Sequence, residues 1–320
     1  MASMSGMLAY GSGFVTLALV SGIACLGLNL QWGQTGLFNV GVAGFVALGA
    51  YTSALLTTAP VAGRLGGYGL PIVVGWTAAM FTAAAASACV GAATLRLKSD
   101  YLAITSFGVA VAVELVLRNA ESLTGGNFGI GSIPRPFERL SPEPVAFGLA
   151  NLLLACLVVA GAVLVLERLL RSPWGRVLRA VREDERAASA LGKHVARYRL
   201  EAFAIGGALM GLAGAMQAHW VGFISPDNYE AALTFQIWTM LIVGGSGNNW
   251  GALLGAGLVS MLWSASGLAT GLLFPPEDQA RAAALRIVAI GVLLAVMIVL
   301  RPRGLIGERL GVSRHLPGVR

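Results

Sequence analysis

Long apolar runs constrain this chain more than any other feature of its sequence. They fall at residues 13–31, 37–58, 70–94, 101–118, 145–166, 200–220, 231–245, 251–273 and 283–300. Several reach the ~20 residues that an α-helix needs to cross the hydrocarbon core of a membrane. Charged residues make up 12% of the chain, against ~25% in soluble domains, so a soluble fold could not cover so many apolar helices. We predict an all-α fold, a polytopic transmembrane helical bundle of about 8–10 spans.

The second run, 37–58, leaves two structures open. It is rich in small residues, including Gly41, Gly44 and Gly49, and small residues let membrane helices approach closely. The run forms either a full span or a broken, partly re-entrant helix, whose non-helical backbone would need protein or water around it. If the run crosses fully, the N-terminus lies outside the cytoplasm; if it does not, the N-terminus lies inside.

The basic residues are divided unevenly between the two ends of the predicted spans. The turn 95–100, the segment 167–199 and the tail 301–320 would share one side, and they hold 16 of the 22 Lys and Arg residues. The positive-inside rule places that side, and the C-terminus, in the cytoplasm. Because the net charge of +7 is concentrated beside spans, we expect contact with membrane lipid and no nucleic-acid partner. The first ten residues lack the basic segment of a signal peptide, so the first span itself should direct insertion.

The segment Glu167–Arg199 is the one long charged stretch, with nine basic and four acidic residues. Ser172-Pro173 is a helix-start signal and Gly192 a natural stop, so we predict one amphipathic helix that runs to about Leu191. Its apolar face would carry Val177, Val181, Ala188 and Leu191, while Arg176, Arg179, Arg182, Glu183 and Arg186 favour the other faces. Such a helix could lie in a groove of a partner protein or on anionic headgroups. The third alternative is a solvated basic loop.

Motifs for catalysis are missing from the sequence. A phosphate-binding loop needs G-x-x-x-x-G-K-[ST], and neither Lys98 nor Lys193 has that context. No Ser/His/Asp, Cys/His or paired-carboxylate arrangement is apparent, so we expect no catalytic residues and no ATPase site in this chain. Cys25, Cys89 and Cys156 lie in three separate apolar runs. We interpret them as buried structural thiols, and we predict no metal site.

Polar side chains at span depth are the candidates for a transit path, because they are costly there and often functional. The candidates are Asn29, Gln31, Gln34, Thr35, Asn39, Thr105, Glu114 and Gln236. For the cluster from Asn29 to Asn39, the capping of a broken helix is an equal alternative. Glu114 stands four residues before Arg118, the favourable order for an ion pair within one helix, so a self-satisfied pair is the alternative there.

Five strings occur in an order that carries a family resemblance. They are L-N-L-Q-W-G-Q-T-G-L-F-N-V-G, L-R-L-K-S-D-Y-L-A-I-T-S-F-G, T-G-G-N-F-G-I, S-P-W-G-R-V-L-R-A-V-R-E-D-E and G-G-S-G-N-N-W-G-A-L-L-G-A. In addition, E-R-A-A-S-A-L-G at Glu185–Gly192 is similar to the Glu-Ala-Ala…Gly loop of ABC-importer permeases, with one residue inserted after the Glu. From about residue 20 to residue 305 the chain closely resembles the branched-chain amino acid ABC transporter permeases, the M-type subunit of the Liv family.

The resemblance implies a single transmembrane permease domain over 1–320, with a cytoplasmic coupling loop at 167–199 and a basic cytoplasmic tail at 301–320. It implies a multi-pass protein of a bacterial-type cytoplasmic (inner) membrane. The partners would be two ABC ATPase subunits, a second homologous permease subunit and an external substrate-binding protein. ATP and Mg would sit on the ATPase subunits, with no cofactor in this chain.

The resemblance also implies residue roles. Contact with the ATPase would involve Arg176, Arg179, Arg182, Glu183, Glu185, Ala187, Ala188 and Gly192. Closure of the ATPase pair would push this loop as a lever and switch the pore between outward and inward access. Thr124, Gly125 and Gly126 would lie at the external mouth, where a substrate-binding protein could dock; an ordinary glycine turn is the alternative.

Three other functions stay open. The chain reads N-V-G-V-A-G-F where relatives often have a polar or His residue after N-x-G, and permeases for urea and short-chain amides share the same architecture. An ion-coupled secondary carrier would need ionisable residues in mid-span, for which Glu114 is the one fair candidate. A membrane enzyme would need catalytic side chains clustered at one membrane face.

Overall fold

A computed structural model describes residues 2–61, 63, 65–94, 99–273, 278–301 and 303–308. Each of the nine apolar runs contains one helix, because no proline interrupts the interior of any run and most of its residues are good helix formers. These helices are α1 (Ala2–Leu28), α2 (Val42–Thr57), α3 (Ile72–Thr94), α4 (Ser99–Asn119), α6 (Pro144–Arg171), α9 (Val195–Val221), α10 (Ala231–Gly244), α11 (Asn249–Leu273) and α12 (Gln279–Leu300). The prediction of an all-α bundle of apolar helices is confirmed for the described residues.

Seven short elements join these helices. They are the π-helical turn η1 (Asn29–Gly33), α5 (Glu121–Thr124), the 3-10 turns η2 (Gly126–Phe128) and η3 (Glu138–Leu140), the helices α7 (Pro173–Glu183) and α8 (Glu185–Ala190), and the 3-10 turn η4 (Pro226–Tyr229). Apart from α7 and α8, they are short turns that connect one apolar helix to the next. The basic turn 95–98 and most of the tail, 309–320, lie outside the described residues.

Five helical segments are long and apolar enough to cross a membrane. They are Met4–Gly33, Ile72–Thr94, Tyr101–Asn119, Pro144–Arg171 and Val195–Val221. Helices α2 and α10, with 16 and 14 residues, are shorter than the ~20 residues that a straight span requires.

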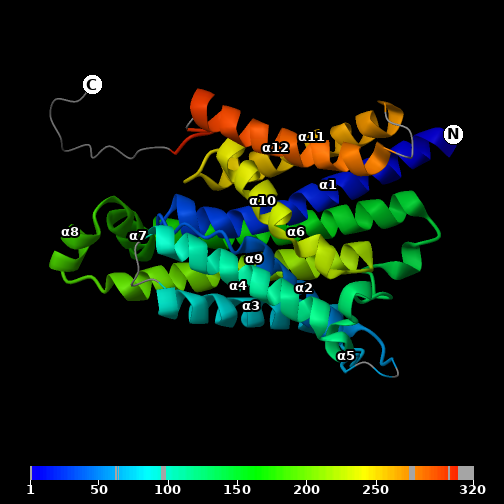
Figure 1. The fold of residues 1–320 in the computed structure, drawn as a ribbon, viewed down its shortest axis with the longest axis horizontal. Coiled ribbons are helices and arrows are strands. Elements are labelled where there is room, and N and C mark those ends of the chain that lie inside the picture. Colours follow the sequence, from blue (N-terminus) through cyan, green and yellow to red (C-terminus); the bar gives the residue numbers. More distant parts are fainter. Residues whose placement is uncertain are drawn as a thin grey trace.

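Helices α1 and α9 form the centre of the bundle. Helix α9 packs against α1, α2 and α3, and α1 also packs against α6 and α11. Helices α10, α11 and α12 lie on one side of α1, and α2, α3 and α4 lie on the other side (Figure 1). The N-terminus lies at the end of the bundle away from α7 and α8 (Figure 1). Helices α3, α4 and α6 are much less buried than α1 and α9. In the most apolar stretch of each helix, 22% is buried for α3 and for α4 and 28% for α6. Such exposure suits helices that face lipid or a partner.

Glycine allows the closest approach between the central helices. A methyl group at Gly214 of α9 would collide with the carbonyl oxygen of Val46 in α2, and one at Gly49 of α2 would collide with the backbone of Gly211 in α9. Backbones this close gain dispersion contacts that larger side chains would prevent. The predicted role of Gly49 in close helix packing is therefore confirmed.

The structure corrects three predictions about the spans. The first helix begins at Ala2 rather than at residue 13, because the small residues before it continue the helix. The second begins at Val42 rather than at residue 37, because the chain after Gly36 is irregular. Cys25 is buried, but Cys89 and Cys156 face outward, so the prediction of three buried thiols is wrong for two of them.

Candidate functional site

The charged segment between α6 and α9 folds as two helices rather than the single predicted helix. The backbone at Asp184 is extended, with φ −150° and ψ 104°, and its carboxylate accepts hydrogen bonds from the amides of Arg186 (2.9 Å) and Ala187 (3.0 Å). Aspartate competes for its own backbone in this way and favours the N-cap over the helix interior. It therefore ends α7 and starts α8, and the two helices form a hairpin.

The buried face of the hairpin agrees with the prediction except at its end. Val181 and Ala188 pack together with Val195 of α9, with Val177 against them. Leu191, predicted on the same face, has 78% of its surface exposed, because the break at Asp184 turns α8 away from the axis of α7. Gly192 has a positive φ of 75° and ends the hairpin as predicted.

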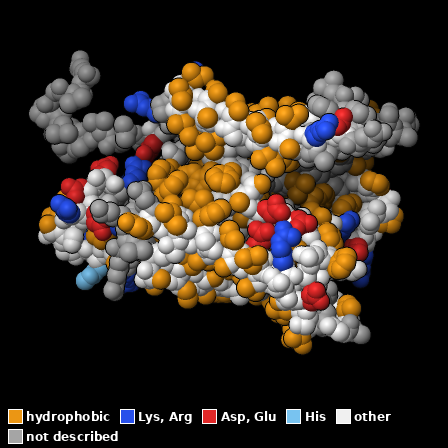
Figure 2. Space-filling view, in the orientation of Figure 1, with side chains coloured by type: hydrophobic (Ala, Val, Ile, Leu, Met, Phe, Trp, Pro, Cys, Tyr) orange, Lys and Arg blue, Asp and Glu red, His pale blue; other side chains and the backbone are white. Residues whose placement is uncertain are grey.

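The structure divides the predicted ATPase contacts into outward and inward side chains. Arg179 and Arg182 are half-buried and Ala188 is buried. We define the hairpin surface as the exposed set Arg176, Glu183, Glu185, Arg186, Ala187, Leu191 and Gly192. Charged side chains gather at this end of the molecule (Figure 2). Within the predicted set, the groups able to touch a partner are therefore the exposed ones.

Arg182 connects the hairpin to the membrane part of the chain. Its Nη1 donates to the carbonyl oxygen of Gly33 in η1, and its Nη2 forms a two-point contact with the Glu308 carboxylate at 2.8 and 2.9 Å. The segment that carries Glu308 is held in turn, since the amides of Leu305 and Ile306 donate to the carbonyl oxygens of Val243 and Gly244 at the end of α10. One guanidinium thus joins α7, the end of α1 and the C-terminal segment.

The predicted path residues from Asn29 to Asn39 surround η1 and form most of their hydrogen bonds with protein groups, although Oε1 of Gln34 has no partner among the described residues. Asn29, Gln31, Gln34, Thr35 and Asn39 are at most 3% exposed. Gln31 donates to the carbonyl oxygen of Phe203 (2.8 Å) and accepts from Asn39 (2.7 Å). Asn29 donates to Asn249 (2.9 Å) and accepts from the amide of Gly247 (2.8 Å).

Most of these bonds satisfy irregular backbone. Gln34 donates to the carbonyl oxygen of Gly247 (2.7 Å), Thr35 donates to that of Gln31, and Asn39 accepts from the amide of Gly41 (2.8 Å). Backbone groups outside a regular helix need such partners at membrane depth. The contacts are those expected for the capping alternative, and a role of these side chains in the transit path stays a prediction.

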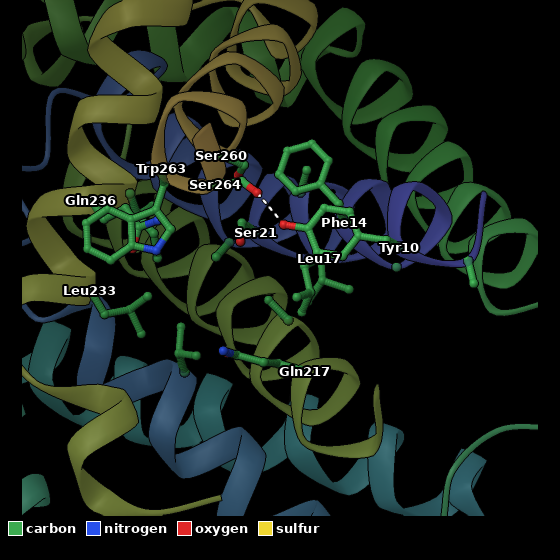
Figure 3. Close-up of a pocket in the computed structure, with 18 residues that line it drawn as sticks. Tyr10, Phe14, Leu17, Ser21, Gln217, Leu233, Gln236, Ser260, Trp263 and Ser264 are labelled. Carbon is green, nitrogen blue, oxygen red and sulfur yellow. Dashed lines mark hydrogen bonds between the residues drawn. The ribbon is translucent and has the colours of Figure 1, made fainter. Parts of the chain in front are cut away.

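A cavity of about 510 Å³ lies between α1, α9, α10 and α11. Its polar side chains include those of Tyr10, Ser21, Gln217, Gln236 and Ser264 (Figure 3). The hydroxyls of Tyr10 and Ser264 are hydrogen-bonded at 2.9 Å. The remaining walls are apolar and aromatic and include Phe14, Leu17, Leu233, Ile237 and Trp263. Its volume is within the range of small-molecule sites, roughly 300–1,000 Å³.

Gln236 is the one predicted path residue that lines this cavity. The sequence analysis did not single out Gln217, which stands on α9 among apolar and small residues. An amide inside an apolar run was the signal available, as it was for Gln236. Thr105 is half-buried on α4, away from the cavity lining, and its predicted path role stays untested.

Glu114 belongs to a charged cluster near the end of α4. Arg118 pairs with Glu114 (2.9 Å), with Asp227 (2.8 Å) and with Glu230 (3.0 Å). The predicted ion pair is thus present, and it also ties α4 to η4 and the start of α10. The pair is satisfied within the chain, so Glu114 is no free ionisable group.

The predicted external mouth is a glycine turn built around one buried side chain. Thr124 is 1% exposed and its hydroxyl donates to the carbonyl oxygens of Leu117 (2.6 Å) and Ala120 (2.8 Å). Gly125 and Gly126 adopt positive φ angles of 77° and 61°, which favour glycine. The neighbouring Phe128 is 91% exposed, so the turn presents an aromatic side chain that the sequence analysis did not single out. Docking of a partner here stays a prediction.

Comparisons with known proteins agree on one family. A family model described as "Branched-chain amino acid transport system / permease component" matches residues 11–300. The chain is 37% identical over 262 residues, 75% of its length, to the high-affinity branched-chain amino acid transport system permease protein LivM of Escherichia coli K12. It is 29% identical over 327 residues, 90% of each chain, to the probable LivM of Methanocaldococcus jannaschii.

Further comparisons concern the extent of these matches and more distant relatives. The match covers 60% of the length of the Escherichia coli relative, and no solved structure matches the chain. A more distant relative, 31% identical over 198 residues (59% of this chain and 54% of that relative), is the autoinducer 2 import system permease protein LsrC of an Enterobacter strain. With its apolar, span-length helices, the chain is a multi-pass membrane protein and belongs to the family of permease components of branched-chain amino acid transport systems.

Proposed function

We propose that this chain is the membrane-spanning permease subunit of an ABC importer. It translocates branched-chain or related neutral amino acids, using ATP that separate ATPase subunits hydrolyse. The observation that carries the proposal is the hairpin surface, a charged two-helix projection between two span-length helices. The sequence around it has no phosphate-binding loop, so the energy of ATP has to enter through contact with another subunit.

The hairpin is attached firmly enough to transmit a displacement. The indole nitrogen of Trp174 in α7 donates to the carboxylate of Glu201 in α9 (2.8 Å), and Glu185 of α8 pairs with Arg199 of α9 (2.9 Å). Arg182 adds the contact with η1. A partner that pushes the hairpin surface would therefore move α9 and the end of α1 together, which is the lever motion that switches the pore.

The proposed assembly contains two ABC ATPase subunits that carry ATP and Mg, a second homologous permease subunit and an external substrate-binding protein. Residues 1–320 act as one permease domain in the inner membrane, with the hairpin and the C-terminus in the cytoplasm. The sparsely buried faces of α3, α4 and α6 suit the second permease or lipid. The glycine turn from Thr124 to Gly126 lies at the opposite end, where the binding protein would dock.

Reconstitution with ATPase, permease and binding-protein partners into liposomes tests the proposal. Uptake of radiolabelled L-leucine should require ATP inside the cytoplasmic compartment. Arg176→Glu on the hairpin surface should reduce both the retention of the ATPase subunits and uptake. Arg139→Glu, the same charge reversal at an exposed residue near the other end, is the matched control and should leave ATPase retention unchanged.

Three outcomes would contradict the proposal. Uptake that proceeds without ATP and collapses with an ion gradient would identify a secondary carrier instead. Equal ATPase retention for Arg176→Glu and the wild type would remove the hairpin surface from the interface. ATP-driven uptake of urea or acetamide in place of L-leucine would leave the importer mechanism intact and contradict the proposed substrate. The relative named as part of an autoinducer 2 import system supports this alternative.

A further inference from the structure

The cavity between α1, α9, α10 and α11 has free hydrogen-bonding capacity, whereas the polar cluster around η1 has little. Among the described residues, the amides of Gln217 and Gln236 and the hydroxyl of Ser21 have no hydrogen-bonding partner. An amide offers two donors and an acceptor, and leaving them unpaired inside an apolar bundle is unfavourable. These groups are therefore available to a molecule that enters the cavity.

The cavity is free of full charges. Among the described residues that line it, none is Asp, Glu, Lys, Arg or His. A solute with a net charge would leave water there without meeting a counter-charge, which is strongly unfavourable. A zwitterion or a neutral polar molecule binds there more favourably, because amide N–H groups can donate to a carboxylate while amide oxygens accept from an ammonium group.

The apolar walls suit an aliphatic side chain. Phe14 and Leu17 of α1 and Leu233 and Ile237 of α10 border the same space as the two amides. In Figure 3 the side chains of Gln217 and Gln236 extend from α9 and α10 into the space between the helices. A solute with one polar head and one short aliphatic group would contact both kinds of wall at once.

The cavity also lies where an entering solute would arrive. Its lining comes from the second half of α9, the first half of α10 and residues 9–24 in the middle of α1. The second half of α9 lies at the end of the bundle away from the hairpin (Figure 1). In the proposed orientation this is the external half of the membrane.

We propose that this cavity is the solute-binding site of the permease and that Gln217 and Gln236 hold the polar head of a solute without net charge. Leu17 contacts its aliphatic group. The inference rests on the proposed function and adds to it the residues that bind solute and set the discrimination against charged solutes.

Filling the cavity tests its occupancy by solute in the complete reconstituted complex. Leu17→Trp should lower uptake of L-leucine by about tenfold or more, which corresponds to about 1.4 kcal/mol of lost binding. Val292→Trp on the exposed face of α12, with 57% of Val292 exposed, is the matched control and should stay within about twofold of the wild type. Equal uptake by the two variants would overturn the proposal.

Changing the charge of the cavity tests its selectivity. Gln236→Glu should lower uptake of L-leucine and increase inhibition of the residual uptake by L-lysine, because a carboxylate now offers a counter-charge. A merely structural role would lower uptake without changing the order of competing solutes, and that result would contradict the assignment.

Protection of a cavity cysteine from a thiol reagent by L-leucine provides a test that does not depend on whether the Leu17→Trp variant folds. In a chain whose native cysteines are replaced by alanine, Ser264→Cys, which lines the cavity without being assigned a solute contact, should react with a small methanethiosulfonate, and excess L-leucine should slow the reaction. Unchanged reactivity would overturn the proposal. If the wild-type complex takes up no L-leucine with ATP, the proposed function fails; if it does and the cavity variants match their controls, this inference alone fails.

Discussion

Two kinds of side-chain amide occur inside the bundle, the buried amides around η1 and the half-buried amides of Gln217 and Gln236, and their partners distinguish them. Asn29 and Gln31 each form two bonds with protein groups, and in this way they hold η1 against α9 and the turn before α11. Gln217 and Gln236 face a cavity instead. An amide with its bonds filled by protein stabilises the fold, whereas one that faces a cavity can bind a solute.

The substitution Asn29→Leu should lower the stability of the protein strongly. The leucine leaves the backbone amide of Gly247 and the side-chain Oδ1 of Asn249 without their 2.8 and 2.9 Å partners. Each buried group left unpaired costs about 1–3 kcal/mol. The apparent melting temperature in detergent measures the loss.

Asn119→Leu is the matched control for this substitution. Asn119 is exposed and bonds only to the carbonyl oxygen of Leu115 in its own helix (2.7 Å) among the described residues. Its replacement should change stability by no more than about 0.5 kcal/mol. Similar melting temperatures for the two variants would show that the amides around η1 do not support the fold.

The sequence indicated that residues 29–39 are unusual, but not which role they have. Polar residues inside an apolar run predict either a path or a cap, because both uses need hydrogen bonds at membrane depth. The choice depends on partners such as Phe203 and Asn249, which are distant in sequence. For the same reason Gln217 was missed, since nothing local marks it as facing a cavity.

At the level of helices, the hairpin and the C-terminal segment form one unit through Arg182. Arg182 and Glu308 form an ion pair in which both side chains are only partly exposed, 21% for Arg182 and 25% for Glu308. Charge pairs shielded in this way hold more firmly than fully exposed ones. The hairpin is thereby fixed to η1 and to the segment after α12.

Arg182→Gln should loosen that unit without unfolding the chain. Hydrogen exchange should increase at the amides of Leu305 and Ile306, which bond to Val243 (2.9 Å) and Gly244 (2.9 Å), because the Glu308 anchor is lost. Arg176→Gln, on the exposed side of the same helix, is the control. Exchange that rises equally in both variants, or in neither, would contradict a linking role for Arg182.

The close contact between α2 and α9 predicts how glycine substitutions affect stability. Gly214→Ala places a methyl group against the carbonyl oxygen of Val46, and such overpacking costs about 1–3 kcal/mol. Gly108→Ala on α4 meets no atom within 4 Å and should be neutral or stabilising by about 0.5–1 kcal/mol. Melting temperatures in detergent compare the two, and a Gly214→Ala variant as stable as the wild type would refute the tight contact.

For the whole molecule, sequence predicted the helices well and their ends less well. Apolar length fixes where helices form, so all nine runs contain one. The breaks at η1 and at Asp184 depend on side chains that satisfy particular backbone groups, which apolar patterning does not report. The cavity depends on how four helices pack together, and packing partners cannot be deduced from one sequence.

The direction of the nine long helices makes a prediction about topology. The hairpin lies at one end of the bundle, and the N-terminus and α5 lie at the other end (Figure 1). Because most of the described basic residues lie in the segment 167–199, at or beside the hairpin, the positive-inside rule places that end in the cytoplasm. The N-terminus should then face outward, which requires the second apolar run to count as a crossing.

Single cysteines in a chain without native cysteines test this orientation. Ser189→Cys lies on α8, whereas Met7→Cys and Phe128→Cys replace residues that are 75% and 91% exposed at the other end. A membrane-impermeant maleimide should label positions 7 and 128 in intact cells and position 189 only after the membrane is opened. Labelling of positions 7 and 189 from the same side would mean that the second run does not cross. Labelling of position 189 in intact cells would place the hairpin outside, beyond the reach of a cytoplasmic ATPase, and the proposed mechanism would be wrong.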